Sequence, residues 1–185
     1  EWGKREFHFG RELWIESDDF QVNPEKGFFR LYPPKDGTSG GRVRLRHGFV
    51  IECTGYDTDA NGQVIAVHAN YFADSKSGTP ESNNYKVKGN LHWVSAKNAI
   101  KAEIRIYDRL FTDPHPDSGD KNFLDAINPN SKQVLTAYLE PSLGNVKAEQ
   151  RFQFERHGYF VADRVDHNAT KPVFNMCVGL KDTWK

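Results

Sequence analysis

Hydrophobic and polar side chains alternate in short segments along most of this chain. In the clearest segment, Arg42, Arg44 and Arg46 alternate with Val43 and Leu45. A period of two residues is typical of a half-buried β-strand, because successive strand residues face opposite sides of a sheet. The pattern therefore predicts a strand whose arginines line one face while its valine and leucine enter a core.

Similar alternation between turn residues predicts nine strands in all. They cover Glu12–Ile15, Gly41–Cys53, Val64–Tyr71, Lys86–Val94, Ala102–Leu110, Lys132–Tyr138, Gln150–Phe154, Gly158–Ala162 and Val173–Gly179. The Asn61-Gly62 dipeptide predicts a hairpin turn between two of these runs. Helix is scarce, and only Lys121–Ile127 and Ser95–Ile100 suggest short helices. We expect an all-β protein built as antiparallel barrels or sandwiches.

The strands divide about equally between two halves of the chain. We expect two tandem antiparallel β-barrels with very little helix, one over residues 1–98 and the other over residues 99–185. The boundary between them is the least defined feature of this prediction, and the strand contribution of residues 1–11 is left open.

Composition narrows the kind of partner that the chain can bind. Lys plus Arg and Asp plus Glu each number 25, so the formal net charge is zero and any nucleic-acid site must be local. The two cysteines, Cys53 and Cys177, predict free, buried thiols in a reducing compartment. No apolar run is long enough for a membrane-spanning helix. Because the sequence opens at Glu1 without methionine, we expect a fragment of a longer protein.

No catalytic set of residues assembles in the sequence. His115 lies near Asp113 and Asp117, but the proline-rich context predicts a surface turn. Asp18 and Asp19 are interpreted as turn or capping residues. The cysteines and histidines lack the spacing of a zinc site, and no glycine-rich phosphate loop occurs.

The arginine row is the first candidate for binding chemistry. Alternate residues of a strand lie roughly 6.5–7 Å apart on one face, which is close to the phosphate spacing of an extended single strand. Guanidinium groups at Arg42, Arg44 and Arg46 could hold such a backbone or read splayed bases. The alternative is a solvated edge strand that is kept charged against aggregation.

The segment Phe152–Phe160 is a second candidate. Phe152 and Phe154 are expected on one face, which leaves Gln153 on the other. The amide of Gln153 offers a donor and an acceptor side by side, matching the Watson–Crick edge of a pyrimidine. Arg156 could pair with Glu155 or reach a phosphate, and an ordinary hairpin with polar outer residues remains the alternative.

The segment Gly27–Leu31 is a third candidate. Arg30 could hydrogen-bond the two-acceptor edge of a guanine. Phe28 or Phe29 could stack on a base, although such a pair is more often part of a core.

Several ordered motifs together resemble the C-terminal anticodon-binding region of bacterial-type glutaminyl-tRNA synthetases, over nearly the whole chain from Arg5 to Trp184. These motifs are Val43–Arg46, Lys86–Gly89, His92–Ala96, Glu103–Phe111, Ile127–Pro129 with Ser131, Glu140–Leu143, Phe152–Phe160, Val178–Leu180 and Asp182–Trp184. The resemblance implies a pair of β-barrels related to a ribosomal-protein RNA-binding barrel, with each anticodon base in its own pocket.

The resemblance also implies roles for the arginines of the first half. Arg30 would read the third anticodon base, a guanine, while Arg44 and Arg46 would hold the first base and its phosphate. Phe29 stands where some members of the family carry a basic residue.

In the second half, the resemblance implies a pocket for the middle uracil. Gln153 would form it with support from Glu155 and Arg156, and Thr183 would touch the anticodon arm.

The family's activity implies ATP, magnesium and a catalytic half that this sequence lacks. No His-Ile-Gly-His or Lys-Met-Ser-Lys-Ser type signature occurs here, so we expect these residues to bind RNA without catalysis and without a cofactor. The expected partners are the anticodon loop of glutamine tRNA and the catalytic domain of the same polypeptide. We expect a cytoplasmic monomer without membrane contact.

Three other functions remain open at this stage. An archaeal or eukaryotic-type glutamyl-tRNA synthetase shares the barrel pair. A stand-alone ribosomal-RNA-binding barrel would use similar chemistry. A carbohydrate-binding module is suggested by the 13% aromatic content, but it would require exposed aromatic platforms.

Overall fold

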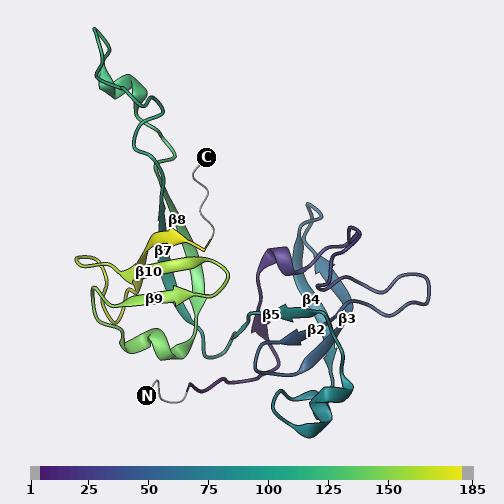
Figure 1. The fold of residues 1–185 in the computed structure, drawn as a ribbon. Helices are drawn as coiled ribbons and strands as arrows, with labels where there is room; N and C mark the ends of the chain where they lie inside the picture. Colours follow the sequence, from purple (N-terminus) through teal and green to yellow (C-terminus); the bar gives the residue numbers. More distant parts are fainter. Residues whose placement is uncertain (1–4, 181–185) are drawn as a thin grey trace. The chain divides into compact units, whose positions relative to one another are not determined.

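The structure is a computed structural model that describes residues 5–180, and it divides the chain into two compact units. One unit spans Phe7–Lys97, and the other contains the described residues from Asn98 onward together with Arg5 and Glu6. In the described residues, regular structure consists of strands and short 3-10 turns (Figure 1). The all-β prediction is confirmed. No helix among residues 5–180 is long and apolar enough to cross a membrane.

The first unit is built on a four-stranded sheet in the order β4-β3-β2-β5, with a separate two-stranded ladder of β1 and β6. Its elements are β1 (Leu13–Trp14), η1 (Ser17–Asp19), β2 (Arg42–Leu45), β3 (Val50–Thr58), β4 (Val64–Tyr71), η2 (Ala73–Ser75), η3 (Pro80–Asn84), β5 (Gly89–Leu91) and β6 (Val94–Ser95). The β2–β3 and β3–β4 ladders are antiparallel, whereas β2 and β5 run parallel with Val43 opposite Gly89.

The core of this unit lies on the inner face of the sheet. Val43 and Leu45 are fully buried while Arg42 is exposed, as the alternation in the sequence predicts. Apolar contact with its neighbours fixes the register of β2, because a slip by one residue would bury arginines instead. The buried cluster contains Leu31, Val43, Leu45, Ile51, Cys53, Leu91 and Trp93.

Turn chemistry decides where the strands of this unit end. The predicted hairpin at Asn61-Gly62 is present, with Gly62 at φ 79° and the Asp59 carboxylate accepting from the backbone N–H of Asn61 and Gln63. The run Gly41–Cys53 is not one strand, because a turn at residues 46–49 divides it into β2 and β3. His47 adopts φ 58° in that turn, and the N–H of Gly48 donates to the carbonyl of Leu45.

The predicted helix at Ser95–Ile100 is wrong. Ser95 belongs to β6 and pairs with Leu13, and the N–H of Ala96 donates to the carbonyl of Glu12. Pairing with a strand distant in the sequence therefore overrides the local capping signal. The predicted helix at Lys121–Ile127 is reduced to one short 3-10 turn, η4 (Phe123–Ala126), which the Asn122 side chain caps.

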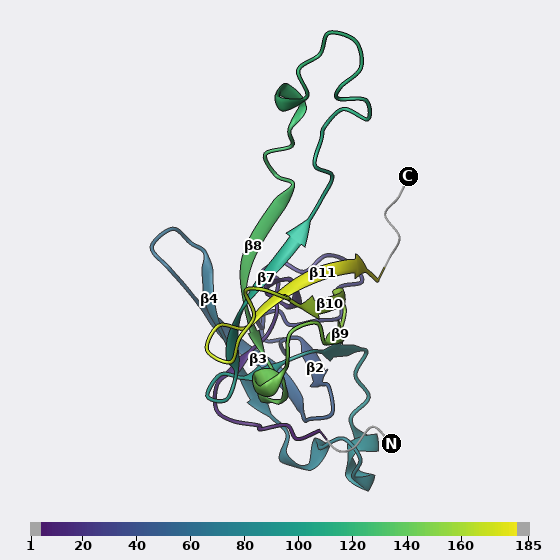
Figure 2. The ribbon, with the colours of Figure 1, turned by 90° about the vertical axis from the view of Figure 1, so that its left-hand side faces the viewer.

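The second unit is a five-stranded sheet in the order β8-β7-β11-β10-β9. Its strands are β7 (Ile100–Tyr107), β8 (Lys132–Leu139), β9 (Arg151–Phe154), β10 (Gly158–Ala162) and β11 (Val173–Gly179), and η5 (Pro141–Asn145) follows β8. The β7–β11 ladder is parallel and the others are antiparallel. Beyond β7 and β8 the chain continues as an arm, residues 108–131, that extends away from the sheet (Figure 2).

The core of the second unit is small and aromatic. Phe174 and Phe160 are buried, and Phe154 stacks on Phe160 with ring centroids 4.5 Å apart. Phe152 packs on Phe174 from the same face. The free thiols differ from the prediction in one respect: Cys53 is buried, and burial raises its pKa, whereas Cys177 is exposed.

A buried arginine ties the second sheet to the loop after β10. Arg105 is only 8% exposed, and its guanidinium contacts Glu103 Oε1 at 2.6 Å and Asp166 Oδ2 at 2.6 Å. Asp163 accepts backbone hydrogen bonds from Asp166 and Val165 and a side-chain hydrogen bond from Asn175. These donors lower the pKa of Asp163 from its ordinary 3.8 to about 2.

This network predicts a loss of stability in acid. Because the folded state depresses the pKa of Asp163, its stabilisation is present above about pH 4 and is lost as the pH falls towards about 2. We expect Asp163→Asn to lower the free energy of unfolding at neutral pH by about 1.5–3 kcal/mol. The variant should also show a flatter pH dependence than the unchanged chain in urea denaturation between those pH values.

Asp120→Asn is the matched control, because Asp120 is an exposed carboxylate in the arm without a described side-chain partner. An acid profile that is identical in Asp163→Asn and the unchanged chain would contradict the assigned role.

Candidate nucleic-acid interface

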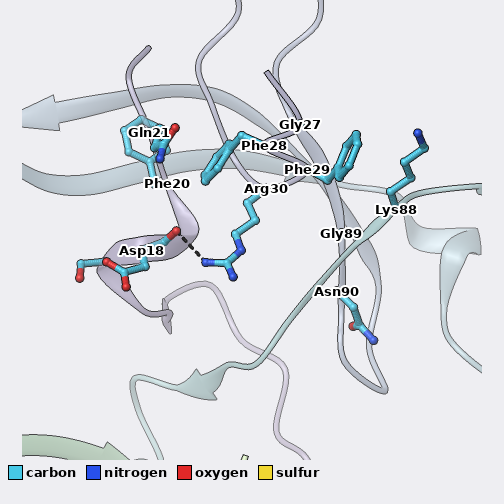
Figure 3. A pocket seen from close by; sticks show the side chains of 11 residues that line it. Asp18, Phe20, Gln21, Gly27, Phe28, Phe29, Arg30, Lys88, Gly89 and Asn90 are labelled. Atoms are coloured by element: carbon cyan, nitrogen blue, oxygen red, sulfur yellow. Dashed lines mark hydrogen bonds between the residues drawn. The ribbon is translucent and has the colours of Figure 1, made fainter. Parts of the chain in front are cut away.

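Arg30 lies in the segment before β2, next to Leu31, which forms a parallel bridge with Phe20 at the end of η1. The Nη1 atom of Arg30 donates to the backbone carbonyl of Asp18 at 2.9 Å (Figure 3). The same atom lies 3.1 Å from Asp19 Oδ1. The Asp19 side chain is fully buried, whereas 37% of the Arg30 side chain remains exposed. One edge of the guanidinium is therefore fixed by the protein, and the other can meet a ligand.

A cavity of about 620 Å³ opens beside this guanidinium. Its size falls within the roughly 300–1,000 Å³ of small-ligand sites. Its lining combines aromatic rings, polar groups and both signs of charge, from Ser17, Asp18, Phe20, Gln21, Gly27, Phe28, Phe29, Arg30, Lys88, Gly89 and Asn90. A second cavity of about 400 Å³ shares Phe28, Phe29, Arg30, Lys88 and Gly89 with the first.

Gly89 allows the two walls of the cavity to approach each other. A Cβ atom at this position would lie inside van der Waals contact of the Phe29 carbonyl oxygen and 2.8 Å from Val43 Cγ1. Only glycine therefore permits the Phe28–Arg30 segment to lie directly against β5, which brings Lys88 close to Phe29.

Arg44 does not point freely into solvent. Its Nη1 donates to the Ser75 carbonyl at 2.6 Å, and its Nη2 donates to the Ser82 carbonyl at 3.1 Å. Longer contacts reach Ser77 Oγ and the Tyr85 carbonyl. The guanidinium thus holds together the loop between β4 and β5.

The other arginines of the row occupy different surroundings. Arg42 pairs with Glu52 on β3, and its Cζ lies 5.2 Å from the centre of the Phe72 ring. Arg46 lies in the turn after β2, where its exposed side chain contacts His47 Nε2 at 3.3 Å. Arg42 and Arg44 alternate with the buried Val43 and Leu45 in β2, as the period of two predicts, whereas Arg46 lies beyond the last strand residue.

Gln153 is exposed on the outer face of β9. It lies opposite Tyr159 of β10, which in turn lies opposite Val178 of β11. Tyr159 is 48% exposed, so an amide and an aromatic ring stand side by side on the surface. The phenylalanines on either side of Gln153 pack inward, in agreement with the predicted alternation.

Glu155 and Arg156 are partly buried in the turn between β9 and β10. Arg156 adopts φ 69°, and the His157 N–H donates to the Phe154 carbonyl across the turn. Both residues belong to the same β9–β10 hairpin as Gln153. Thr183 lies outside the described residues.

The predicted site residues fall into two groups, one in each unit. Arg30, Arg44 and Arg46 belong to the first unit, and Gln153, Glu155 and Arg156 belong to the second. Within the first group, Arg30 lies at its own cavity and Arg44 holds a different loop.

Three further residues, which the sequence analysis did not assign to a site, lie beside Arg30 or Gln153. Asp19 does lie in a turn, as predicted, and it is also the buried partner of Arg30. Lys88 reaches the Arg30 cavity from a distant part of the sequence, and Tyr159 lies across from Gln153. The basic–apolar alternation of Lys86-Val87-Lys88 could have indicated the position of Lys88, whereas nothing in the local sequence reveals the partners of Asp19 or Gln153.

Among the described residues, no group of histidine, cysteine or acidic side chains could hold a metal ion.

Known proteins resemble this chain over its whole length. Two family models match the chain, one over residues 1–72 and one over residues 90–163, and both describe the anticodon-binding domain of class I tRNA synthetases (E and Q). Among curated relatives, glutamine–tRNA ligases of Polynucleobacter necessarius, Ralstonia nicotianae and Nitrosomonas europaea are 71%, 65% and 51% identical. Each match covers 100% of this chain but only 31% or 32% of the relative.

These findings define the class of protein as domains of the anticodon-binding type found in tRNA synthetases. The chain belongs to the family of anticodon-binding domains of class I synthetases for glutamate and glutamine. The resemblance noted from the sequence motifs is confirmed. The chain spans about a third of the length of the curated relatives that it matches.

The hydrogen bonds of Arg44 predict a structural effect of its loss. Arg44→Ala leaves the carbonyls of Ser75 and Ser82 without their donor, so we expect the free energy of unfolding to fall by about 1–3 kcal/mol. Urea denaturation measures the change. Arg11→Ala, which removes an exposed arginine of the same unit without a described partner, should change stability by less than about 0.5 kcal/mol. Equal effects of the two substitutions would show that the loop does not depend on Arg44.

Proposed function

We propose that this chain binds the anticodon loop of glutamine tRNA as part of a glutamine–tRNA ligase. The observation that carries the proposal is the half-exposed guanidinium of Arg30, fixed by a buried carboxylate at an open, aromatic-lined cavity, in a member of this family. An arginine held in this way can offer parallel N–H groups to the O6 and N7 acceptors of guanine. The aromatic walls suit an unstacked base.

The activity of the whole protein follows from the same proposal. The relatives are named glutamine–tRNA ligases, and such a ligase would join glutamine to its tRNA using ATP and magnesium. That chemistry would take place in a catalytic domain outside these 185 residues. The present units would contribute specificity by holding the anticodon, in a monomeric enzyme of the cytoplasm, and would need no cofactor of their own.

Each site residue receives a role in this proposal. Arg30 reads the third anticodon base, and Arg46 contacts the first base or its phosphate. Arg44 supports that contact by ordering the loop between β4 and β5, because its donors already serve the carbonyls there.

The second unit binds the middle base. Gln153 reads the edge of the uracil from β9, and Glu155 and Arg156 shape the turn beside it. Thr183 contacts the anticodon arm. The division of the anticodon between two β-barrels, over about residues 1–98 and 99–185, belongs to the same proposal.

A synthetase for glutamate is the second candidate, because the description of the family models covers both amino acids. The names of the relatives favour glutamine. A stand-alone RNA-binding barrel is disfavoured because the chain matches only part of much longer proteins.

Arg30→Ala tests the guanine contact. We expect the variant to lose about 1–3 kcal/mol of preference for the cognate anticodon over one in which the third base is adenine. Equilibrium binding of the 185-residue chain to both tRNAs, measured at several salt concentrations, gives the preference. A loss of the same size on both tRNAs would make Arg30 a phosphate contact or a structural residue.

Gln153→Ala tests the middle-base pocket. We expect it to relax discrimination between uracil and cytosine at the middle position and to leave third-base discrimination unchanged. Gln150→Ala, in the turn before the same strand, is a neighbouring control that should retain both preferences. Undiminished middle-base discrimination in Gln153→Ala would remove that residue from the proposed pocket.

A further inference from the structure

A lysine–phenylalanine pair forms part of the wall that the two cavities of the first unit share. Lys88 Nζ lies 4.5 Å from the centre of the Phe29 ring, and both residues line both cavities. Figure 3 shows the Phe29 ring beside the Lys88 side chain, with Arg30 and Phe28 on the other side of the ring. Phe29 is 52% exposed. The aromatic ring therefore separates two cationic side chains at the surface.

The charges around the cavities are compensated unequally. Arg30 lies against the carboxylate of Asp19, and Arg42, which lines the second cavity, pairs with Glu52. Lys88 is exposed and has no ion pair or side-chain hydrogen bond among the described residues. An anion at the Arg30 cavity would therefore meet the uncompensated charge of Lys88 rather than that of an arginine. Lys86, which is also exposed and without a described ion pair, lines the second cavity but not the first.

A cation–π contact directs the ammonium group without neutralising it. The ring quadrupole attracts the cation only weakly at an exposed site, and the full positive charge remains available to an anion. Lysine also suits a phosphate, because its compact ammonium group is a point charge with rotatable donors. Gly89 adds to this geometry, since the close contact between β5 and the Phe29 carbonyl fixes the two backbones side by side.

We infer that Lys88 neutralises a backbone phosphate of the nucleotide whose base enters the Arg30 cavity, and that Phe29 is the positioning residue for its ammonium group. The inference rests on the proposed function and adds to it a division of labour. Arg30 distinguishes the base, whereas Lys88 contributes affinity that is independent of the base.

Salt dependence separates these two roles. Each phosphate contact on a single strand contributes about 0.7 to the slope of log K against log salt concentration. We expect Lys88→Ala to reduce the slope by about that amount on the cognate tRNA and on the tRNA with a substituted third base. Lys97→Ala, which removes an exposed lysine that lines neither cavity, should leave the slope unchanged.

The positioning role of Phe29 is tested in combination with Lys88. Phe29→Leu keeps an apolar side chain but removes the ring, and we expect weaker binding with a smaller slope. The double variant Phe29→Leu, Lys88→Ala should bind like Lys88→Ala alone, because Phe29 acts through the lysine. The double variant Phe29→Lys, Lys88→Ala carries the positive charge at position 29 instead of position 88, and it should restore most of the slope. Thermal unfolding of each variant verifies that it is folded.

The outcomes distinguish this inference from the proposed function. An unchanged slope in Lys88→Ala would overturn the phosphate contact, even where the unchanged chain still prefers the guanine-containing anticodon. A further loss in the double variant would overturn the positioning role and make Phe29 a base-stacking residue. No preference by the unchanged chain for any anticodon would instead refute the proposed function.

Discussion

The parallel ladder between β2 and β5 is the constraint on which the first unit depends. It places Gly89 opposite Val43, and so it brings a segment from far along the chain against the strand that carries the arginine row. The buried side of this ladder supplies Val43, Leu45 and Leu91 to the core. On its other side, β5 contacts the Phe28–Arg30 segment, and Lys88 directly precedes β5 in the chain. These residues line the cavity. The shape of the cavity therefore depends on the β2–β5 ladder.

The proposed RNA binding is compatible with the neutral composition of the chain, because its charges are paired locally. Arg30, Arg42 and Arg44 of the first unit are held by carboxylates or carbonyls, which fixes their direction. The carboxylates of Asp19 and Glu52 offset the charge of the first two arginines. Buried Asp19 shows the cost of this arrangement, because a carboxylate removed from water is tolerated only with a cationic partner and hydrogen bonds. In the proposed function, one side chain would supply orientation for base reading and another would supply charge for phosphate binding.

Local pattern predicted the strands better than their pairing. Gly158–Ala162 and Val173–Gly179 were predicted to the residue, because their alternation is bounded by clear turn residues. The parallel pairings of β2 with β5 and of β7 with β11 were not predicted, since the sequence suggested hairpins joined in antiparallel order. The turn at residues 46–49 was also missed, although Gly48 could have indicated it.

The candidate site was predictable only in part for the same reason. The exposure of Gln153 and the shared face of Arg42 and Arg44 follow from a period of two. Arg44 donates hydrogen bonds to the loop between β4 and β5, and Arg30 pairs with Asp19. Both contacts join residues that are distant in sequence. Such contacts are set by tertiary packing, which no local pattern contains.

The parallel pairing of β7 with β11 also bears on how the second unit acquires its structure. The partner of Glu103 is Val173, about 70 residues later, so the central ladder of this sheet closes a long loop. Loop closure of this kind makes folding slower than the formation of hairpins such as β9–β10. During synthesis, β7 and β8 can pair early, but β7 has a strand on only one side until β11 has left the ribosome. For that interval the edge of β7 is open to pairing with other chains, which is a route to aggregation of the nascent protein.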